Sequence, residues 1–272
     1  MDRKLLQYLV EYLVKESEAH WCALPPAAAD AAHDDLASAS ADELWLAFRS
    51  LVNVRPPWPA PAEFLAAQNE LLQGLIAEAG VATLADATPS PTDSRLRLWR
   101  GDITTLAVDA IVNAANSDMT GCWAPLHYCI DNAIHTFAGV QLREACANLM
   151  AAQGHPEPTA QAKVTDAYNL PARYVIHTVG PIADGRPTDT HRRQLTECYQ
   201  ACLDAVAGAG LASIAFCCIS TGVFGFPQAE ASSIAVATVR RWLDEHPDAS
   251  MTVVFNVFSE TDEHLYRPLL GL

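Results

Sequence analysis

Two cysteines and a histidine stand close together in the sequence, at Cys122, His127 and Cys129. Cysteine thiolates and neutral imidazoles are ligands that Zn²⁺ prefers in proteins. A structural zinc site has four protein ligands, whereas a catalytic site has three and keeps one position for water or substrate. Gly121 and Pro125 lie in the same segment and favour a loop that bends around one ion. The spacing therefore predicts a zinc site with one open position.

The same residues allow a simpler interpretation, because an isolated buried cysteine is usually an inert core residue. A zinc ion could also serve only to hold the loop in place. Cys129 stands where a helix is expected to begin, and the helix dipole favours a thiolate there. Asp131, Asn132 and His135 follow on that helix as candidates for orienting the ligands or the substrate. His135 is expected to act as a supporting residue or general base, or else to pack in the core.

The composition excludes some classes of function. The 272 residues carry a formal charge of −15, with a pI near 4.8, which argues against non-specific binding of nucleic acid. Backbone N–H groups and helix N-termini can still bind a diphosphate in an acidic protein. No signal peptide or membrane-spanning stretch is evident in the sequence. With eight cysteines and no need for disulfides in a chain of this size, we expect free thiols in a reducing cytoplasm and a monomer.

Two regions differ in their sequence patterns. Residues 1–90 predict a helical N-terminal extension, with helices around 5–14, 44–52 and 64–79 and a loop or weak helix at 24–35. The segment TPSPTDS at 88–94 is a junction rich in residues that break regular structure. Residues 91–272 form the second predicted domain.

The second region alternates between strand and helix patterns. Strands are expected in the segments RLRLWRGDI, DAIVNAAN, AKVTDAYNL, RYVIHTVG, SIAFCCIS and TVVFNVF. Helices are expected near 129–151, 190–208, 227–245 and 261–270. This alternation predicts an α/β fold with a largely parallel sheet, whose ligands bind beyond the carboxyl ends of the strands.

A glycine-containing turn, STGVFGFP at 220–227, follows one of these strands and precedes a helix. Gly222 and Gly225 permit backbone conformations that aim successive N–H groups at one point, as a pyrophosphate requires. Most such turns are ordinary connections between a strand and a helix, so the motif alone is weak evidence.

Taken in order, GDIT, IVNAAN, AYNLPARYVIHTVGP, STGVFG and NVF closely resemble the macrodomain family, whose members bind ADP-ribose. The resemblance covers about residues 95–272 and implies a three-layer α/β/α fold with a mixed, largely parallel sheet. It assigns Asp102, beside Ile103, to the adenine amino group, Phe258 to the adenine ring, and Asn113 and Asn116 to the distal ribose. It assigns the pyrophosphate to the turn residues Ser220, Thr221, Gly222, Val223, Phe224 and Gly225.

The segment GCWAPLHYCIDNAIHTFAG resembles the signature of zinc-dependent macrodomains, which have a helical extension like residues 1–90. This resemblance implies a Zn²⁺-dependent hydrolase that removes mono-ADP-ribose from modified proteins. It also suggests a sirtuin-like ADP-ribosyltransferase as a functional counterpart. Three alternatives remain at this point: an ADP-ribose-binding module without activity, a structural zinc, and an O-acetyl-ADP-ribose deacetylase.

Overall fold

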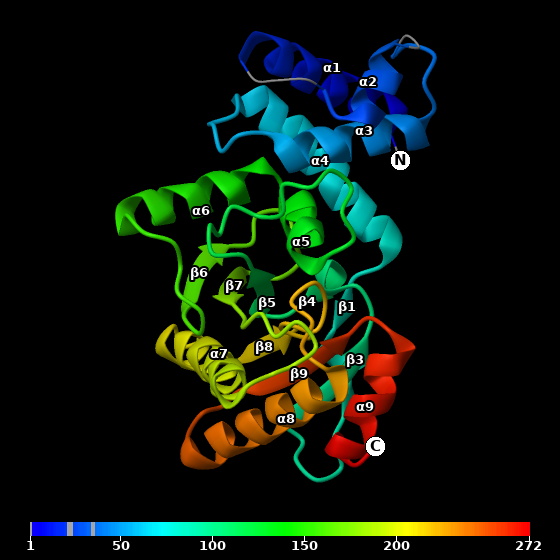
Figure 1. The fold of residues 1–272 in the computed structure, drawn as a ribbon. Helices are drawn as coiled ribbons and strands as arrows, with labels where there is room; N and C mark the ends of the chain where they lie inside the picture. Colours follow the sequence, from blue (N-terminus) through cyan, green and yellow to red (C-terminus); the bar gives the residue numbers. More distant parts are fainter. Residues whose placement is uncertain (1, 21–23, 34–35) are drawn as a thin grey trace.

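A bundle of helices forms one end of the molecule (Figure 1). The computed structural model describes residues 2–20, 24–33 and 36–272. The bundle helices are α1 (Arg3–His20), α2 (Pro26–His33), α3 (Ala41–Val54) and α4 (Ala62–Ala79). Helix α2 forms within the segment for which we predicted a loop or weak helix. Of the eight cysteines, Cys22 lies outside the described residues, and the seven described ones are unpaired thiols.

The helical bundle has a hydrophobic core of its own. Leu9 and Leu13 of α1, Phe48 of α3 and Phe64 of α4 are fully buried in it. Ser40 caps α3: its side chain accepts from the backbone N–H of Glu43, whose carboxylate accepts from the Ser40 backbone N–H. Such a reciprocal cap fixes where the helix begins.

The rest of the chain is built on a seven-stranded sheet in the order β2-β3-β9-β8-β5-β7-β6. The neighbouring strands pair in parallel except at the two edges, where β2 pairs with β3 and β6 with β7 in antiparallel fashion. The strands are β2 (Thr88–Pro89), β3 (Leu96–Arg100), β5 (Ala110–Ala115), β6 (Ala162–Asp166), β7 (Tyr174–Val179), β8 (Ser213–Phe216) and β9 (Thr252–Val257). The predicted mixed, largely parallel sheet is confirmed.

Helices cover both faces of this sheet. They are α5 (Ile130–Ala138), α6 (Val140–Gln153), α7 (Asp189–Gly208), α8 (Gln228–Glu245) and α9 (Glu260–Leu270). The connection from β5 through α5 and α6 leads to the edge strand β6 and from there to β7, and the connection from β7 through α7 returns past β5 to β8. Right-handed crossovers in opposite directions place α5 and α6 on one face and α7 on the other. The helix predicted at 129–151 is divided in two at Gly139, whose φ is +98°.

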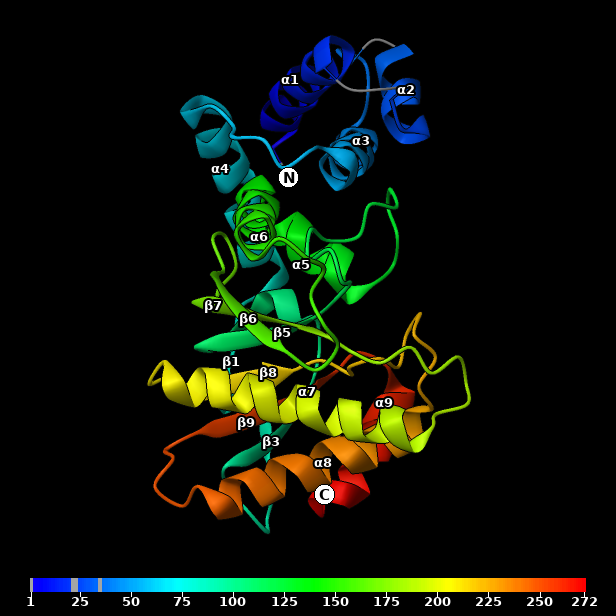
Figure 2. The ribbon, with the colours of Figure 1, turned by 60° about the vertical axis from the view of Figure 1, so that its left-hand side comes forward.

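The carboxyl ends of the parallel strands meet at one edge of the sheet. Figure 2 shows the loops that follow β5, β7 and β8 projecting from the same side of the molecule. These loops carry most of the predicted site residues. The fold therefore gathers them where ligands bind in open α/β sheets.

The bundle is joined to the sheet by short strands rather than by a free linker. Strand β1 (Ala82–Thr83) pairs with β4 (Leu106–Ala107), and β2 pairs with β3. The short 3₁₀ helix η1 (Leu84–Asp86) lies between β1 and β2, and a second 3₁₀ helix, η2 (Ile103–Thr105), follows β3. The division at residue 90 stays a prediction, although the helices of the bundle end at Ala79. No helix in the described part of the chain is long and apolar enough to span a membrane.

Candidate functional site

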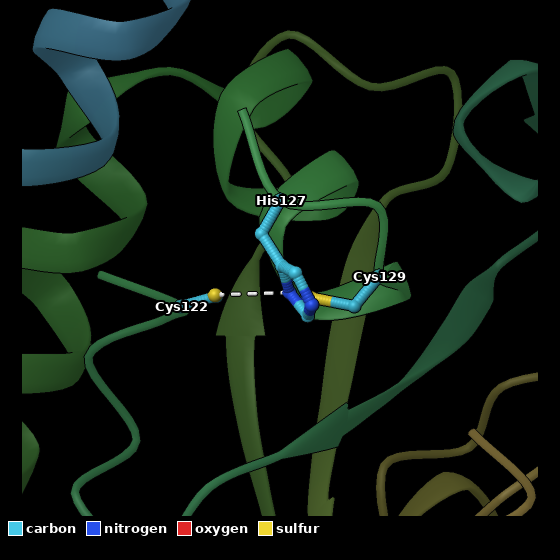
Figure 3. A group of neighbouring side chains, drawn as sticks. All are labelled: Cys122, His127 and Cys129. Atoms are coloured by element: carbon cyan, nitrogen blue, oxygen red, sulfur yellow. Dashed lines mark hydrogen bonds between the residues drawn. The ribbon is translucent and has the colours of Figure 1, made fainter. Parts of the chain in front are cut away.

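The three predicted metal ligands converge on one point. They lie on residues 117–129, the Cys/His loop, which connects β5 to α5. The Cys122 Sγ lies 3.5 Å from the His127 Nδ1, and the ligand atoms of Cys122, His127 and Cys129 lie within 4.8 Å of one another. Figure 3 shows the three side chains pointing toward one another. All three are partly exposed, so a bound ion would remain accessible to a substrate.

The backbone of the Cys/His loop takes unusual conformations to achieve this. Gly121 has a φ of +80°, and a Cβ there would lie 2.7 Å from the His135 ring. Leu126, directly before the predicted ligand His127, has a φ of +58° without being glycine. Such a conformation costs on the order of 1 kcal/mol and persists only where its surroundings enforce it. Cys129 caps α5, its Sγ accepting from the Asn132 N–H at 3.4 Å.

This donor set fits zinc. Bonds of about 2.3 Å to sulfur and about 2.0 Å to nitrogen, in a tetrahedron, separate the two ligand atoms by about 3.5 Å. The Cys122–His127 distance of 3.5 Å matches that separation. Burial, with Cys122 and Asp131 close by, raises the pKa of Cys129, so its thiolate needs a cation as a partner. Two thiolates and one imidazole would leave a fourth position open.

A buried polar chain lies beneath this loop. Asn113 is fully buried and donates from Nδ2 to Asp131 Oδ1 at 2.8 Å, while the same Nδ2 lies 3.1 Å from the His177 Nδ1. Asn116, at the end of β5, donates to the Gly121 carbonyl at 2.9 Å and lies 3.4 Å from Asp131 Oδ2. Burial raises the pKa of Asp131 to about 6, opposed by the Asn113 hydrogen bond and by Arg143. Asn116 and Asp131 thus join the loop to the end of the strand.

His135 lies in the interior of the protein rather than on its surface. Its side chain is 3% exposed, and its Nε2 lies 3.6 Å from Asp131 Oδ1. Neither ring nitrogen has a hydrogen-bond partner among the residues that the structure describes. Burial lowers the pKa of His135 well below its usual range, so the ring is neutral. The geometry favours the packing interpretation of this residue.

His135 also faces Cys146 and His177, a second group of residues that metals bind. Both ring nitrogens of His177 already have partners, since Thr165 Oγ1 lies 2.9 Å from Nε2 and Asn113 contacts Nδ1. Burial raises the pKa of Cys146 to about 12, which keeps its thiol protonated. We therefore interpret His177 and Cys146 as core residues with hydrogen-bond partners of their own, whereas the two ring nitrogens of His135 have none among the described residues.

The second loop at this edge, residues 220–225, is the glycine loop. Gly225 N donates to the Gly222 carbonyl and Phe226 N to the Ser220 carbonyl, each at 2.9 Å. The amides of residues 222–224 donate to no backbone carbonyl within the described ranges. Gly222 and Val223 are exposed, so these amides lie where an anion can reach them. A turn with free, exposed N–H groups is suited to a pyrophosphate.

The connection between β7 and α7 supports the glycine loop, and no pattern in the sequence indicated this. Ala183 N donates to the Phe224 carbonyl at 2.8 Å, and Gly185 N donates to the Gly225 carbonyl at 2.7 Å. Every contact in this set joins backbone to backbone. Residues 183–185 therefore belong to the same wall of the site.

The predicted adenine residues lie together at the ends of β3 and β9. Arg100 pairs with Val257, so Asp102 and Phe258 follow on adjacent strands. Phe258 is 69% exposed, as expected of an aromatic side chain that is to stack on a planar ligand. Asp102 Oδ1 accepts from the Thr104 N–H at 2.9 Å and from its hydroxyl at 2.7 Å, whereas Ile103 is buried. One Asp102 oxygen caps the turn, and the other is available to a ligand.

Similarity to known proteins agrees with this geometry. A family model described as Macro domain matches residues 112–235. The chain is 52% identical over 267 residues to a protein-ADP-ribose hydrolase of Treponema medium, covering 97% of each chain. It is 43% identical over 240 residues to a probable bifunctional ADP-ribose hydrolase/ADP-ribosyltransferase of Fusarium oxysporum f. sp. cubense, covering 82% of this chain and 40% of that one. The Trypanosoma brucei macrodomain in complex with ADP-ribose superimposes with a TM-score of 0.64 at 32% identity, covering 82% of this chain and 95% of that chain.

Proposed function

Because the chain belongs to the macrodomain family, and within it to the protein-ADP-ribose hydrolases, we propose that it removes mono-ADP-ribose from modified proteins with the help of Zn²⁺. The observation that carries the metal part is the convergence of Cys122, His127 and Cys129, all partly exposed, on one point. Binding alone would not require that arrangement. Zinc held there would supply a Lewis acid next to the bond to be cleaved.

Different residues of the chain would bind different parts of the substrate. The free amides of the glycine loop bind the pyrophosphate, and Asp102 and Phe258 bind the adenine, as the resemblance to macrodomains implies. These contacts lie away from the reacting bond and hold it in position, which converts binding into orientation. The distal ribose then lies toward Asn116 and Asp131, at the edge of the Cys/His loop. Asn113 acts on it only through Asp131, because Asn113 is fully buried.

The natural counterpart of this activity would be a transferase that attaches ADP-ribose to proteins. The relative in Fusarium oxysporum is named as a hydrolase and an ADP-ribosyltransferase in one chain, of which this chain matches 40%. We propose a separate, sirtuin-like ADP-ribosyltransferase as the partner in function. A reducing compartment such as the cytoplasm suits the site, because oxidation would remove two thiolate ligands.

One experiment tests the hydrolase and the metal together. Purified protein is assayed for its zinc content and for release of ADP-ribose from a mono-ADP-ribosylated protein, before and after treatment with a chelator. We expect about one zinc per chain, loss of turnover with the chelator, and recovery on adding Zn²⁺. Unchanged turnover by metal-free protein would refute the role of zinc, and ADP-ribose binding without any turnover would favour a binding module.

A further inference from the structure

Helix α3 of the bundle reaches the Cys/His loop with a charged side chain. Arg49 donates from Nη2 to the backbone carbonyl of His127 at 3.3 Å and to Asn132 Oδ1 at 3.1 Å. Its guanidinium also lies 5.9 Å from the centre of the Tyr128 ring, within range of a cation–π contact. A side chain 78 residues away in sequence thus binds the carbonyl of a predicted metal ligand.

One turn further along α3, Asn53 holds the strained part of the same loop. Its Oδ1 accepts from the Leu126 N–H at 2.9 Å, and its Nδ2 donates to Thr136 Oγ1 at 3.1 Å. Asn53 is 1% exposed, so this hydrogen bond is shielded from water. Leu126 is the non-glycine residue with positive φ that precedes His127. Asn53 is therefore placed to enforce the conformation that aims His127 at the cysteines.

Arg143 of α6 ties the end of α3 to the first part of the loop. Its Nη1 donates to the Val52 and Arg55 carbonyls at 3.2 and 2.8 Å. Its Nε and Nη2 donate to the Thr120 and Cys122 carbonyls at 2.7 and 3.3 Å. Burial lowers the pKa of Arg143 only to about 10, so the guanidinium is charged at neutral pH. Hydrogen bonds thus connect both ends of the Cys/His loop to α3, through Arg49 and Asn53 at one end and through Arg143 at the other.

These contacts differ from ordinary packing between domains. Most of them end on backbone groups at or beside the predicted ligand residues, and α3 itself is fixed in the core of the bundle by Phe48 and Leu44. Side chains that orient metal ligands in this way can change metal affinity or activity by about 10- to 100-fold. They need not contact the metal or the substrate.

We propose that the N-terminal helical bundle is a positioning element of the site, and that Arg49 and Asn53 preorganise the Cys/His loop so that His127 and Cys129 meet Cys122. The catalytic consequence rests on the proposed function, whereas the order of the loop is a property of the chain itself. An extension that only stabilised the fold would give a different result on the variants below.

The test compares Arg49→Met and Asn53→Leu with Gln68→Met in the full-length protein. Gln68 of α4 is a matched control, because it is fully buried and accepts from the Val140 N–H at 3.0 Å, as Asn53 accepts from Leu126. Its hydrogen bonds go to Val140, Gln141 and Asn69 rather than to the loop. Asn53→Leu and Gln68→Met each leave one backbone N–H at the same interface without its acceptor.

Two readouts separate positioning from stability. Zinc affinity, measured by competition with a chromophoric chelator, should fall at least about tenfold in Arg49→Met and Asn53→Leu, and stay within about twofold in Gln68→Met. Amide hydrogen exchange of residues 120–129 in metal-free protein should accelerate in the first two variants and not in the control. For ADP-ribose hydrolysis we expect a lower kcat with ADP-ribose affinity unchanged. Melting temperatures should fall to a similar extent in Asn53→Leu and Gln68→Met.

Unchanged loop exchange in Arg49→Met and Asn53→Leu would overturn the proposal, as would an equal effect of Gln68→Met on the loop. If the parent protein binds no zinc but the exchange result holds, the metal-dependent function fails and the positioning of the loop stands. If zinc binding and hydrolysis are present but neither affinity nor exchange responds to Arg49 and Asn53, only the positioning fails.

Discussion

The two loops that flank the site are stabilised in different ways. The glycine loop is held by backbone hydrogen bonds within itself and to residues 183–185. The Cys/His loop is held in addition by side chains from outside the loop, among them Arg49 and Asn53 of the helical bundle and Arg143 of α6. Backbone bonds do not depend on side-chain identity, whereas side-chain bonds can be lost by one substitution far away in sequence. We therefore expect nucleotide binding and catalysis to respond to different sets of mutations.

Removal of a metal ligand should separate the two loops most clearly. In Cys129→Ala we expect hydrolysis to fall by at least about a hundredfold, because a site with two ligands holds zinc poorly. The affinity for ADP-ribose, measured by calorimetry, should stay within about threefold. Cys198→Ala, which removes a buried cysteine outside the trio, serves as the control. A parallel loss of ADP-ribose binding in Cys129→Ala would mean that the two loops form one unit.

Acid should weaken the polar chain beneath the Cys/His loop. Burial lowers the pKa of His177 to about 3 from 6.5, so below pH 6.5 the unfolded chain binds a proton that the folded protein does not. Stability is therefore lost as the pH falls from 6.5 toward 3, by about 2 kcal/mol at pH 5 from this group. The difference in unfolding free energy between pH 7.5 and pH 5, measured with urea, should shrink by that amount in His177→Gln. As a control, His264→Gln changes an exposed histidine and should leave the difference between the two pH values as it is in the parent protein. If the parent protein, His177→Gln and His264→Gln all show the same difference, His177 is not its source.

A backbone change should disturb the glycine loop alone. Gly225 has a φ of +64°, and a Cβ there would lie 3.2 Å from the Asp184 Cα and from the Gly185 N. We expect Gly225→Ala to weaken ADP-ribose binding about tenfold, which corresponds to about 1.4 kcal/mol of strain. Zinc content should not change. Gly208→Ala is the control, because Gly208 lies on α7 outside the site and a Cβ there meets nothing within 4 Å. An equal effect at both glycines would argue against strain as the cause.

The smallest effect is expected at the adenine end. Asp102→Asn keeps the Oδ1 that caps the turn at Thr104 but replaces the free acceptor oxygen by a donor. The affinity for ADP-ribose should fall about fivefold, the cost of one exposed hydrogen bond. The affinity for the inosine analogue, which lacks the adenine amino group, should change little. An equal loss for both ligands would indicate that Asp102 acts only on the fold of the turn.

Much of the fold could be predicted because hydrophobic periodicity is local. The segments at 190–208 and 227–245 became α7 and α8 with ends displaced by at most one residue. The split at Gly139 was missed, because the apolar pattern continues across it and the break depends on contacts with Gln68 and Asn169. The convergence of Cys122, His127 and Cys129 was predictable, since all three lie on one short loop.

The supporting contacts could not be predicted from the sequence. Arg49 and Asn53 lie on an ordinary amphipathic helix, more than 70 residues from the loop that they contact. Their partners within the loop are the His127 carbonyl and the Leu126 N–H, backbone groups that carry no side-chain signal. The place of His135 was equally hidden, because a histidine on a helix at that spacing can face either the cleft or the core.

The short strands between the bundle and the sheet have a consequence for motion. Helix α4 ends at Ala79 and β1 begins at Ala82, paired with β4, while Arg97 binds the carbonyls of Leu84 and Ala87. A hinge needs a few residues that are free to change their backbone angles, and this segment offers little such freedom. The bundle and the sheet are therefore expected to move as one rigid body. Entry and release of a bulky protein substrate would then depend on the loops at the rim and not on the opening of two lobes.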